Sequence, residues 1–229
     1  MKQQVTEAII LSRTDFGEAD RILTLLTPEH GKLRLVARGV RRIKSKLAGG
    51  IELFSVSHVT YIKGRGDLGT LISARLDKHY GRIVQDLQRT MTGYDLIKRL
   101  HKATEDEPEP AYFEILHRTF ESLDDLTIPL VLVQAWFSAQ LLQLAGHTPD
   151  THHDNQGNPL HADMYYTFDL ESMAFAVSPD NGQYGSNHIK ILRLLLNSST
   201  PRVVARIQNA EVLVKPMYAL LTAMERQNS

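Results

Sequence analysis

The spacing of apolar residues changes near residue 80, and this change limits the folds open to the chain. Before that point apolar side chains alternate in short runs, as in residues 33–38, and alternation is the pattern of a β-strand. From about Asp86 they recur every three or four residues, the pattern of an α-helix. The sequence therefore predicts an α+β protein, with a β domain over residues 1–80 and a mainly helical domain over residues 81–229.

Five short strands are expected in the first domain. They are predicted at residues 9–13, 22–26, 33–38, 51–63 and 68–76. The segments TDFGEAD, PEHG and GRGD between them are rich in turn-forming residues. Five strands in so short a stretch predict a small closed barrel, and among such barrels the OB-fold is the common binder of nucleic acid.

Five helices are expected in the second domain. They are predicted at residues 87–101, 113–123, 130–145, 187–197 and 201–226. Pro129 and Gly146 bracket the third helix, which is apolar nearly all round and is therefore the predicted buried centre. The acidic, proline-containing segment 105–110 separates the first two helices, and the last helix is expected to kink or break near Pro216.

A loop-rich insert is expected at about residues 147–186, with one hairpin formed by residues 165–169 and 174–177. The insert contains a group of potential metal ligands: His147, His152, His153, His161, Asp150, Asp154 and Asp163. Their spacing does not suit a tetrahedral site, because no two histidines stand four apart on a predicted helix and adjacent histidines point apart. Solvated loop residues are the favoured interpretation, and a metal site is the alternative.

A run of basic residues is the strongest indication of function. Residues 32–46 carry seven basic side chains and no acidic one, although the formal charge of the chain is zero. Residues 1–80 hold 14 Lys/Arg against 8 Asp/Glu, whereas the rest of the chain holds 12 against 18. Basic runs are often only a solvated surface, but this concentration favours a polyanion as partner, most commonly nucleic acid. The candidate contacts are Lys32, Arg34, Arg38, Arg41, Arg42, Lys44 and Lys46.

Alternation predicts the direction of the first cations in this run. Leu33, Leu35 and Ala37 share one face of the predicted strand, and the other face carries Lys32, Arg34 and Arg38 with Val36. The residues after Gly39 are too basic and irregular for a buried strand and predict a long mobile loop. Lys63 and Arg65 extend the candidate basic surface.

Several other sites are disfavoured. GRGDLG at residues 64–69 fits a dinucleotide-binding pattern, but a strand and not a helix is expected after it, so a hairpin using glycines for positive φ is preferred. The chain has no cysteine for a thiolate metal site or a nucleophile, and no hydrolase or kinase motif. No signal peptide or membrane span is predicted, so we expect a cytoplasmic protein without a cofactor.

The aromatic residues divide into core and undecided positions. Trp136 and Phe137 lie in the most apolar helix and are predicted core residues. Phe16, Phe54 and Tyr61 could belong to the barrel core or could stack on nucleic-acid bases.

The N-terminal motifs resemble those of a known family. GEAD, T-x-E-H-G, A-R-G-V-R-R-x-K-S and G-x-x-x-x-F follow one another in the order seen at the start of RecO, the bacterial recombination mediator family, and the resemblance is close over residues 8–76. It implies an OB-fold followed by a helical domain and a non-enzymatic role in DNA repair. That role comprises binding of single- and double-stranded DNA, strand annealing and recombinase loading.

The resemblance also implies partners. Members cooperate with RecR and with the acidic, apolar C-terminal tail of single-stranded DNA-binding protein. Cations beside an apolar stripe would receive such a tail, and the candidates are Arg118, Arg193 and Arg206. Many members carry a four-cysteine zinc site whose first pair would fall near residues 154–157, where this chain has no cysteine. We therefore expect no metal.

Two other functions remain open on the sequence alone. An RNA-binding OB-fold module would carry the same basic run. A metal-dependent hydrolase built on the histidine-rich insert is the enzymatic alternative.

Overall fold

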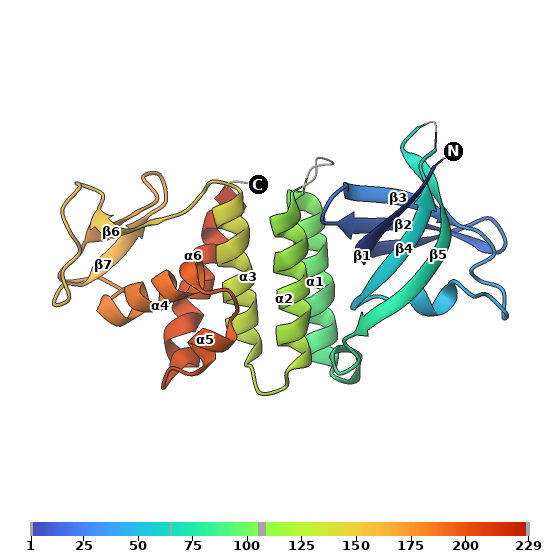
Figure 1. Cartoon of the computed structure of the whole chain (residues 1–229). Coiled ribbons are helices and arrows are strands. Elements are labelled where there is room, and N and C mark those ends of the chain that lie inside the picture. Colours follow the sequence, from blue (N-terminus) through green and yellow to red (C-terminus); the bar gives the residue numbers. More distant parts are fainter. Residues whose placement is uncertain (1, 65, 105–108, 228–229) are drawn as a thin grey trace. The chain divides into compact units, whose positions relative to one another are not determined.

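The computed structural model describes residues 2–64, 66–104 and 109–227, and the chain forms two compact units, Met1–Asp124 and Asp125–Ser229 (Figure 1). Each unit has its own core. The barrel ends at His79, near the expected boundary at residue 80, but α1 (Leu87–Ala103) and α2 (Pro110–Asp124) belong to the same compact unit as the barrel. A division into domains at residue 80 stays a prediction.

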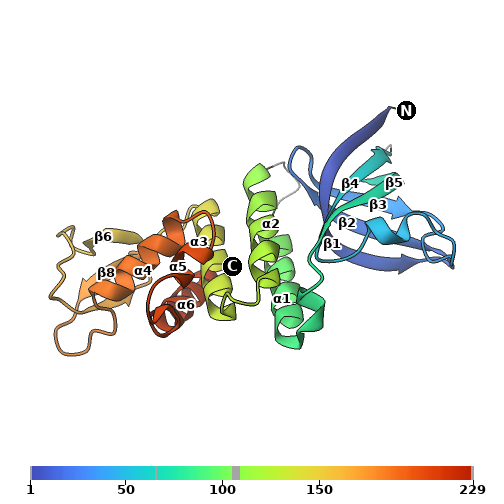
Figure 2. The same cartoon turned by 60° about the horizontal axis from the view of Figure 1, so that its bottom comes forward.

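The N-terminal unit contains the predicted five-stranded barrel. Its strands are β1 (Gln3–Phe16), β2 (Asp20–Thr27), β3 (Gly31–Ala37), β4 (Ser55–Ile62) and β5 (Leu68–His79). They close in the order β1-β2-β3-β5-β4, with β3 and β5 parallel and the other pairs antiparallel. This order is that of the OB-fold, so the α+β fold class with an N-terminal OB-fold barrel is confirmed (Figure 2).

Glycines shape the ends of these strands. Gly17 and Gly31 adopt φ of 58° and 62° in the turns that connect β1 to β2 and β2 to β3. The expected hairpin at GRGDLG is confirmed by the antiparallel pairing of β4 and β5. However, Gly64 and Gly69 do not have positive φ; a Cβ there would lie 2.1 Å from the Leu68 carbonyl oxygen and 2.8 Å from that of Ile62. Close backbone approach is therefore why glycine is required at these two positions.

The fourth strand begins later than the alternation predicts. Residues 51–54 are not a strand: a 3-10 turn at Ala48–Gly50 precedes them, and β4 starts at Ser55. Phe54 has φ of 54°, a left-handed conformation that a strand cannot contain. Its ring is buried and packs edge-to-face on Tyr94 of α1 and Phe120 of α2, at centroid distances of 5.2 and 5.4 Å. The contacts with the two helices thus override the local strand preference.

Helices α1 and α2 pack against β1 and β2 of the barrel. The carboxylate of Asp86 caps α1 by accepting the backbone N–H of Arg89 at 2.9 Å. The buried Arg89 guanidinium donates to the Leu123 carbonyl at 2.8 Å and so joins the two helices. The helices cover the part of the barrel wall where Ile9 of β1 and Leu26 of β2 are buried. Only the rest of the outer face of the barrel is therefore exposed to solvent.

The C-terminal unit is a helical core with a small sheet. Its helices are α3 (Leu130–Leu144), α4 (Ser186–Asn197), α5 (Arg202–Ala205) and α6 (Ala210–Gln227). Trp136 and Phe137 of α3 are buried as predicted, and the Trp136 indole N–H donates to the Ser198 carbonyl at 2.9 Å. Gly146 has φ of 78° just after α3, which supports the predicted end of that helix.

The final helix breaks at a different place from the one expected. Helix α6 continues through Pro216, and the chain leaves helical structure between α5 and α6, where Asn209 has φ of 58°. Pro216 removes one hydrogen-bond donor, and the packing of Val214 and Met217 in the core keeps the helix continuous around it. A break at Pro216 is therefore wrong, because the helical region expected at residues 201–226 is interrupted at residues 206–209; a kink at Pro216 stays a prediction.

The insert contains more regular structure than expected. The predicted hairpin is confirmed as β7 (Tyr166–Asp169) and β8 (Ala174–Val177), and β6 (Asp150–Asp154) adds to β8 in parallel. This three-stranded sheet packs beside α4 (Figure 2). No helix in the described part of the chain is both long and apolar enough to cross a membrane.

Candidate nucleic-acid interface

Strand β3 presents its cations on the outside of the barrel. Leu35 and Ala37 are buried in the barrel core, whereas Arg34 is exposed on the opposite face. The predicted alternation of this strand is therefore confirmed. Arg34 is paired across the sheet with Thr24 of β2 and Leu68 of β5, which places its guanidinium near the middle of the open outer face.

A hollow of about 510 Å³ lies on this face. We call it the cationic hollow, and its titratable lining residues are His30, Lys32, Arg34, Tyr61, Lys63, Asp67 and His101. Asp67 is the one acidic residue of this lining within the part of the chain that the structure describes. Such a set of cations around a concave surface attracts an anionic backbone.

Lys32 has a structural bond in this hollow. Its ammonium donates to the Thr104 carbonyl at 2.6 Å, and Thr104 is the C-terminal cap of α1. This bond holds the end of α1 against β3 and satisfies a carbonyl that the helix leaves unpaired. Lys32 therefore contributes positive charge to the hollow from a fixed position.

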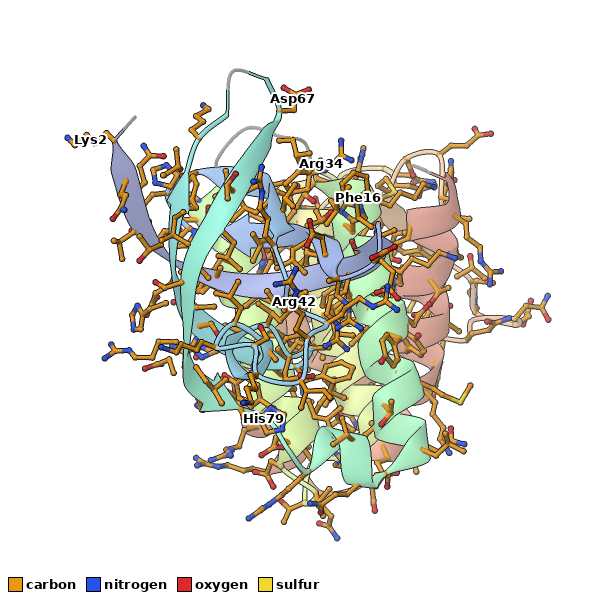
Figure 3. The ribbon with its side chains drawn as sticks, turned by 90° about the vertical axis from the view of Figure 1, so that its right-hand side faces the viewer. Lys2, Phe16, Arg34, Arg42, Asp67 and His79 are labelled. Atoms are coloured by element: carbon orange, nitrogen blue, oxygen red, sulfur yellow. The ribbon has the colours of Figure 1, made fainter. Side chains whose placement is uncertain are left out.

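The basic loop, residues 38–46, carries the rest of the run. Arg38, Arg42, Lys44 and Lys46 are exposed on it, and Figure 3 shows Arg42 on the end of the barrel that faces the viewer. Two bonds to the β1–β2 turn anchor the loop: Arg41 N–H to the Ala19 carbonyl at 2.9 Å, and Gly39 N–H to Asp20 Oδ1 at 2.7 Å. The mobility expected for this segment stays a prediction, and the anchors at Gly39 and Arg41 limit it to residues 42–46.

Arg41 differs from the other loop cations because an acid lies beside it. Its Nε is 3.5 Å from Asp15 Oδ2, and Arg21 donates to the same carboxylate at 2.8 Å. The Arg21 hydrogen bond chiefly, and the Arg41 charge in addition, hold the pKa of Asp15 below its usual range. Asp15 is therefore ionised at neutral pH and partly neutralises Arg41.

The remaining basic candidates lie in the β4–β5 turn. Lys63 is exposed and lines the cationic hollow. Arg65 lies outside the described residues.

Two histidines that line the hollow were missed by the sequence analysis. His30 follows β2, and His101 comes from the last turn of α1. The motif T-x-E-H-G could have drawn attention to His30. Nothing local predicts His101, because its position depends on α1 returning to the barrel.

The three arginines proposed for a protein partner are divided between the units. Arg118 of α2 lies in the N-terminal unit, with ion pairs to Glu114 and Glu121 at 3.5 and 3.1 Å. Arg193 of α4 donates to the Thr151 carbonyl from Nε at 3.0 Å and thereby ties α4 to β6. Arg206 is exposed after α5. Only Arg193 and Arg206 share a unit, and none of the three lines the 310 Å³ apolar hollow between β7 and α6.

The insert carboxylates stabilise turns. Asp150 Oδ1 accepts the backbone N–H groups of His152 and His153 at 2.7 and 2.9 Å. Asp154 Oδ1 accepts those of Gln156 and Asn158 at 2.9 and 2.8 Å, at the turn where the family resemblance locates the first cysteine pair. Burial opposes ionisation of Asp154, but these hydrogen bonds outweigh it and keep its pKa below the usual range.

Within the described residues, a group with metal-ligating spacing occurs on the barrel and not in the insert. His58 Nε2 lies 3.7 Å from Asp77 Oδ1 and 4.0 Å from Glu7 Oε1, on three adjacent strands. The three side chains are about one-third to one-half exposed, and their spacing is also that of ordinary surface ion pairs.

Comparison with known proteins identifies the family. The family model described as "Recombination protein O N terminal" matches residues 1–80, which is the barrel. A protein named DNA repair protein RecO from Dehalococcoides mccartyi strain 195 is 34% identical over 216 residues, covering 91% of this chain and 84% of the relative. The protein of the same name from Listeria welshimeri is 32% identical over 144 residues, covering 62% of this chain and 56% of the relative.

The barrel, the helices that follow it and the identity over nearly the whole chain lead to one conclusion. The chain belongs to the RecO family of DNA repair proteins.

Proposed function

We propose that this protein acts in the cytoplasm as a DNA-binding recombination mediator. In this proposal it binds single- and double-stranded DNA, promotes annealing of complementary strands and assists recombinase loading, without catalysing a covalent step. The observation that carries the proposal is that β3 supplies cations to the cationic hollow and leads directly into the basic loop: Arg34 and Lys63 line the hollow, and Arg38 and Arg42 are exposed on the segment that follows β3.

The physical basis is neutralisation of phosphate charge. Two complementary strands repel each other, and a surface that binds their backbones releases condensed counterions and lowers that repulsion. Arginine and lysine contact phosphates without reading sequence, so the bases stay free to pair. Sequence-independent binding is what an annealing protein requires.

Binding measurements with three nucleic acids test this proposal. We expect the protein to bind labelled single-stranded DNA and duplex DNA with affinities that fall steeply with salt, with a slope of about −3 or steeper in a plot of log K against log salt, since each phosphate contact contributes roughly 0.7–0.9. The annealing rate of complementary labelled strands should rise in parallel. A slope near zero would contradict the proposal, and a large preference for RNA of equal length would favour an RNA-binding module.

We also propose two protein partners, a RecR-like mediator protein and the C-terminal tail of single-stranded DNA-binding protein. The tail brings an apolar end and carboxylates, so it needs a cation beside an apolar surface. Of the three candidate arginines, Arg206 is the exposed one whose side chain has no ion pair or hydrogen bond to described residues. It is therefore the best placed to receive a carboxylate.

The tail peptide provides a direct measurement. We expect a labelled acidic tail peptide to bind wild type, and the charge reversal Arg206→Glu to weaken binding more than Arg118→Glu, because Glu114 and Glu121 already occupy Arg118. Arg193→Glu removes the bond to Thr151, so its melting temperature must be compared with wild type before its affinity is interpreted. Equal affinity in all three variants would reject the residues, and no binding by wild type would reject this partner.

A further inference from the structure

The structure separates the three aromatic residues that the sequence left undecided. Phe54 and Tyr61 are buried, with exposed fractions of 1% and 2%. Phe16 is 51% exposed at the end of β1, where the chain turns into β2. Of the three, only Phe16 offers a ring to an external ligand.

The strand register determines the face from which this ring projects. Arg13 is paired with the buried Leu23, so residue 13 and residue 15 face the inner side of the barrel. Phe16, like Thr14, therefore projects from the outer side. The same outer side carries Thr24, which is paired with both Ser12 and Arg34. Figure 3 agrees, because Phe16 and Arg34 lie toward the same edge of the barrel in that view.

The bonds of the neighbouring residues leave the ring uncovered. Arg13 and Asp15 are engaged on the inner side, with Glu52 at 3.0 Å and with Arg21 at 2.8 Å respectively. Asp20, opposite Phe16 in the hairpin, directs its carboxylate to the N–H of Gly39. Asp15 and Asp20 are thus paired with protein groups, whereas Glu18 of the same turn is exposed.

We propose that Phe16 is a nucleobase-stacking site at one end of the cationic face. This inference rests on the proposed DNA binding. Phe16 lies four positions along β1 from Ser12. Ser12 is paired with Thr24, which is in turn paired with Arg34, so the ring of Phe16 and the Arg34 guanidinium are about 13 Å apart along the strand direction. A single strand of a few nucleotides can span this distance, which suits the smallest footprint of an OB-fold.

The site gives the protein a preference for unpaired bases. An aromatic ring can stack on a base of a single strand, but in a duplex each base is already stacked between its neighbours. The stacking contact is therefore made with the separate strands and is lost when they pair. This difference favours release of the duplex after annealing, whereas the phosphate contacts alone hold single strands and duplex alike.

The test compares a normal strand with one that lacks bases. Phe16→Ala should weaken binding of single-stranded DNA about five-fold or more, the lower end of the effect of removing a stacked ring. Binding of duplex DNA and of an abasic strand of equal length should change less than two-fold, and the salt slope for single-stranded DNA should stay the same because no phosphate contact is removed. Met91→Ala is the control for Phe16→Ala, since Met91 is 59% exposed in the same unit but lies on α1.

A second variant supplies a spectroscopic readout. Phe16→Trp places an exposed indole in a chain whose single tryptophan, Trp136, is buried. A single strand with bases should quench the fluorescence of the new indole, and the abasic strand should not. The stacking site alone would be overturned if Phe16→Ala lost the same affinity for normal and abasic strands. It would also be overturned if Phe16→Ala lost no affinity for either strand while wild type binds DNA. Failure of wild type to bind any DNA would overturn the proposed function as well.

Discussion

Replacing Arg41, Arg42, Lys44 and Lys46 together with alanine will weaken binding to single-stranded and duplex DNA on the order of 100-fold at low salt, irrespective of sequence. The slope of log K against log salt should fall by roughly 2 to 3, since each lost phosphate contact removes about 0.7–0.9. Three of these cations should contribute fully and Arg41 less, because Asp15 lies 3.5 Å from its guanidinium. Fluorescence anisotropy over a series of salt concentrations measures both quantities.

The fold should survive this change, because the anchors of the basic loop are untouched. The buried side chains of Val40 and Ile51, at the two ends of the loop region, are unchanged. The backbone hydrogen bond from the N–H of residue 41 to the Ala19 carbonyl is also unchanged. A control variant removes four exposed cations from the C-terminal unit, at Lys190, Arg206, Lys215 and Arg226. If the folded loop variant binds DNA like this control, the basic loop is not the DNA site.

Replacing Phe54 with alanine will destabilise the N-terminal unit by about 3–5 kcal/mol, which is typical when a buried phenyl ring is removed. The ring packs on Tyr94 and Phe120, and it lies so close to Gly93 that a Cβ on that glycine would be 2.5 Å from its Cε1. The cavity would therefore open between the barrel and both helices. Urea unfolding followed by circular dichroism gives the change in the free energy of unfolding.

Glycine at the same position separates packing from backbone strain. Phe54 has φ of 54°, which costs a residue with a β-carbon about 1 kcal/mol and glycine nothing. Phe54→Gly should therefore be at least as stable as Phe54→Ala. Met91→Ala, at a side chain 59% exposed on α1, should change stability by less than about 0.5 kcal/mol. A loss below about 1 kcal/mol in Phe54→Ala would mean that the ring does not hold the helices to the barrel.

Local patterns in the sequence predicted the class of the barrel strands and of the long helices. The alternation of Leu33, Leu35 and Ala37 was enough to direct Arg34 away from the core, because side chains on a strand alternate strictly between its faces. Helical spacing and Pro129 likewise predicted α3 and its buried side chains. The basic run and the N-terminal motifs indicated nucleic acid and the family, and both signals lie within residues 8–76.

Contacts between distant residues decided the remainder. Phe16 and Phe54 are the same residue type in β-rich sequence, and only the packing of α1 and α2 buries one while the other stays exposed. The cationic hollow exists because the end of α1 returns to β3, where Lys32 bonds to Thr104, 72 residues away in the chain. A sequence pattern reports the period of one segment, whereas burial and concavity depend on which segments meet. Strand alternation therefore directs the cations of β3 away from the core, and the packing of α1 beside β3 creates the surface that they form.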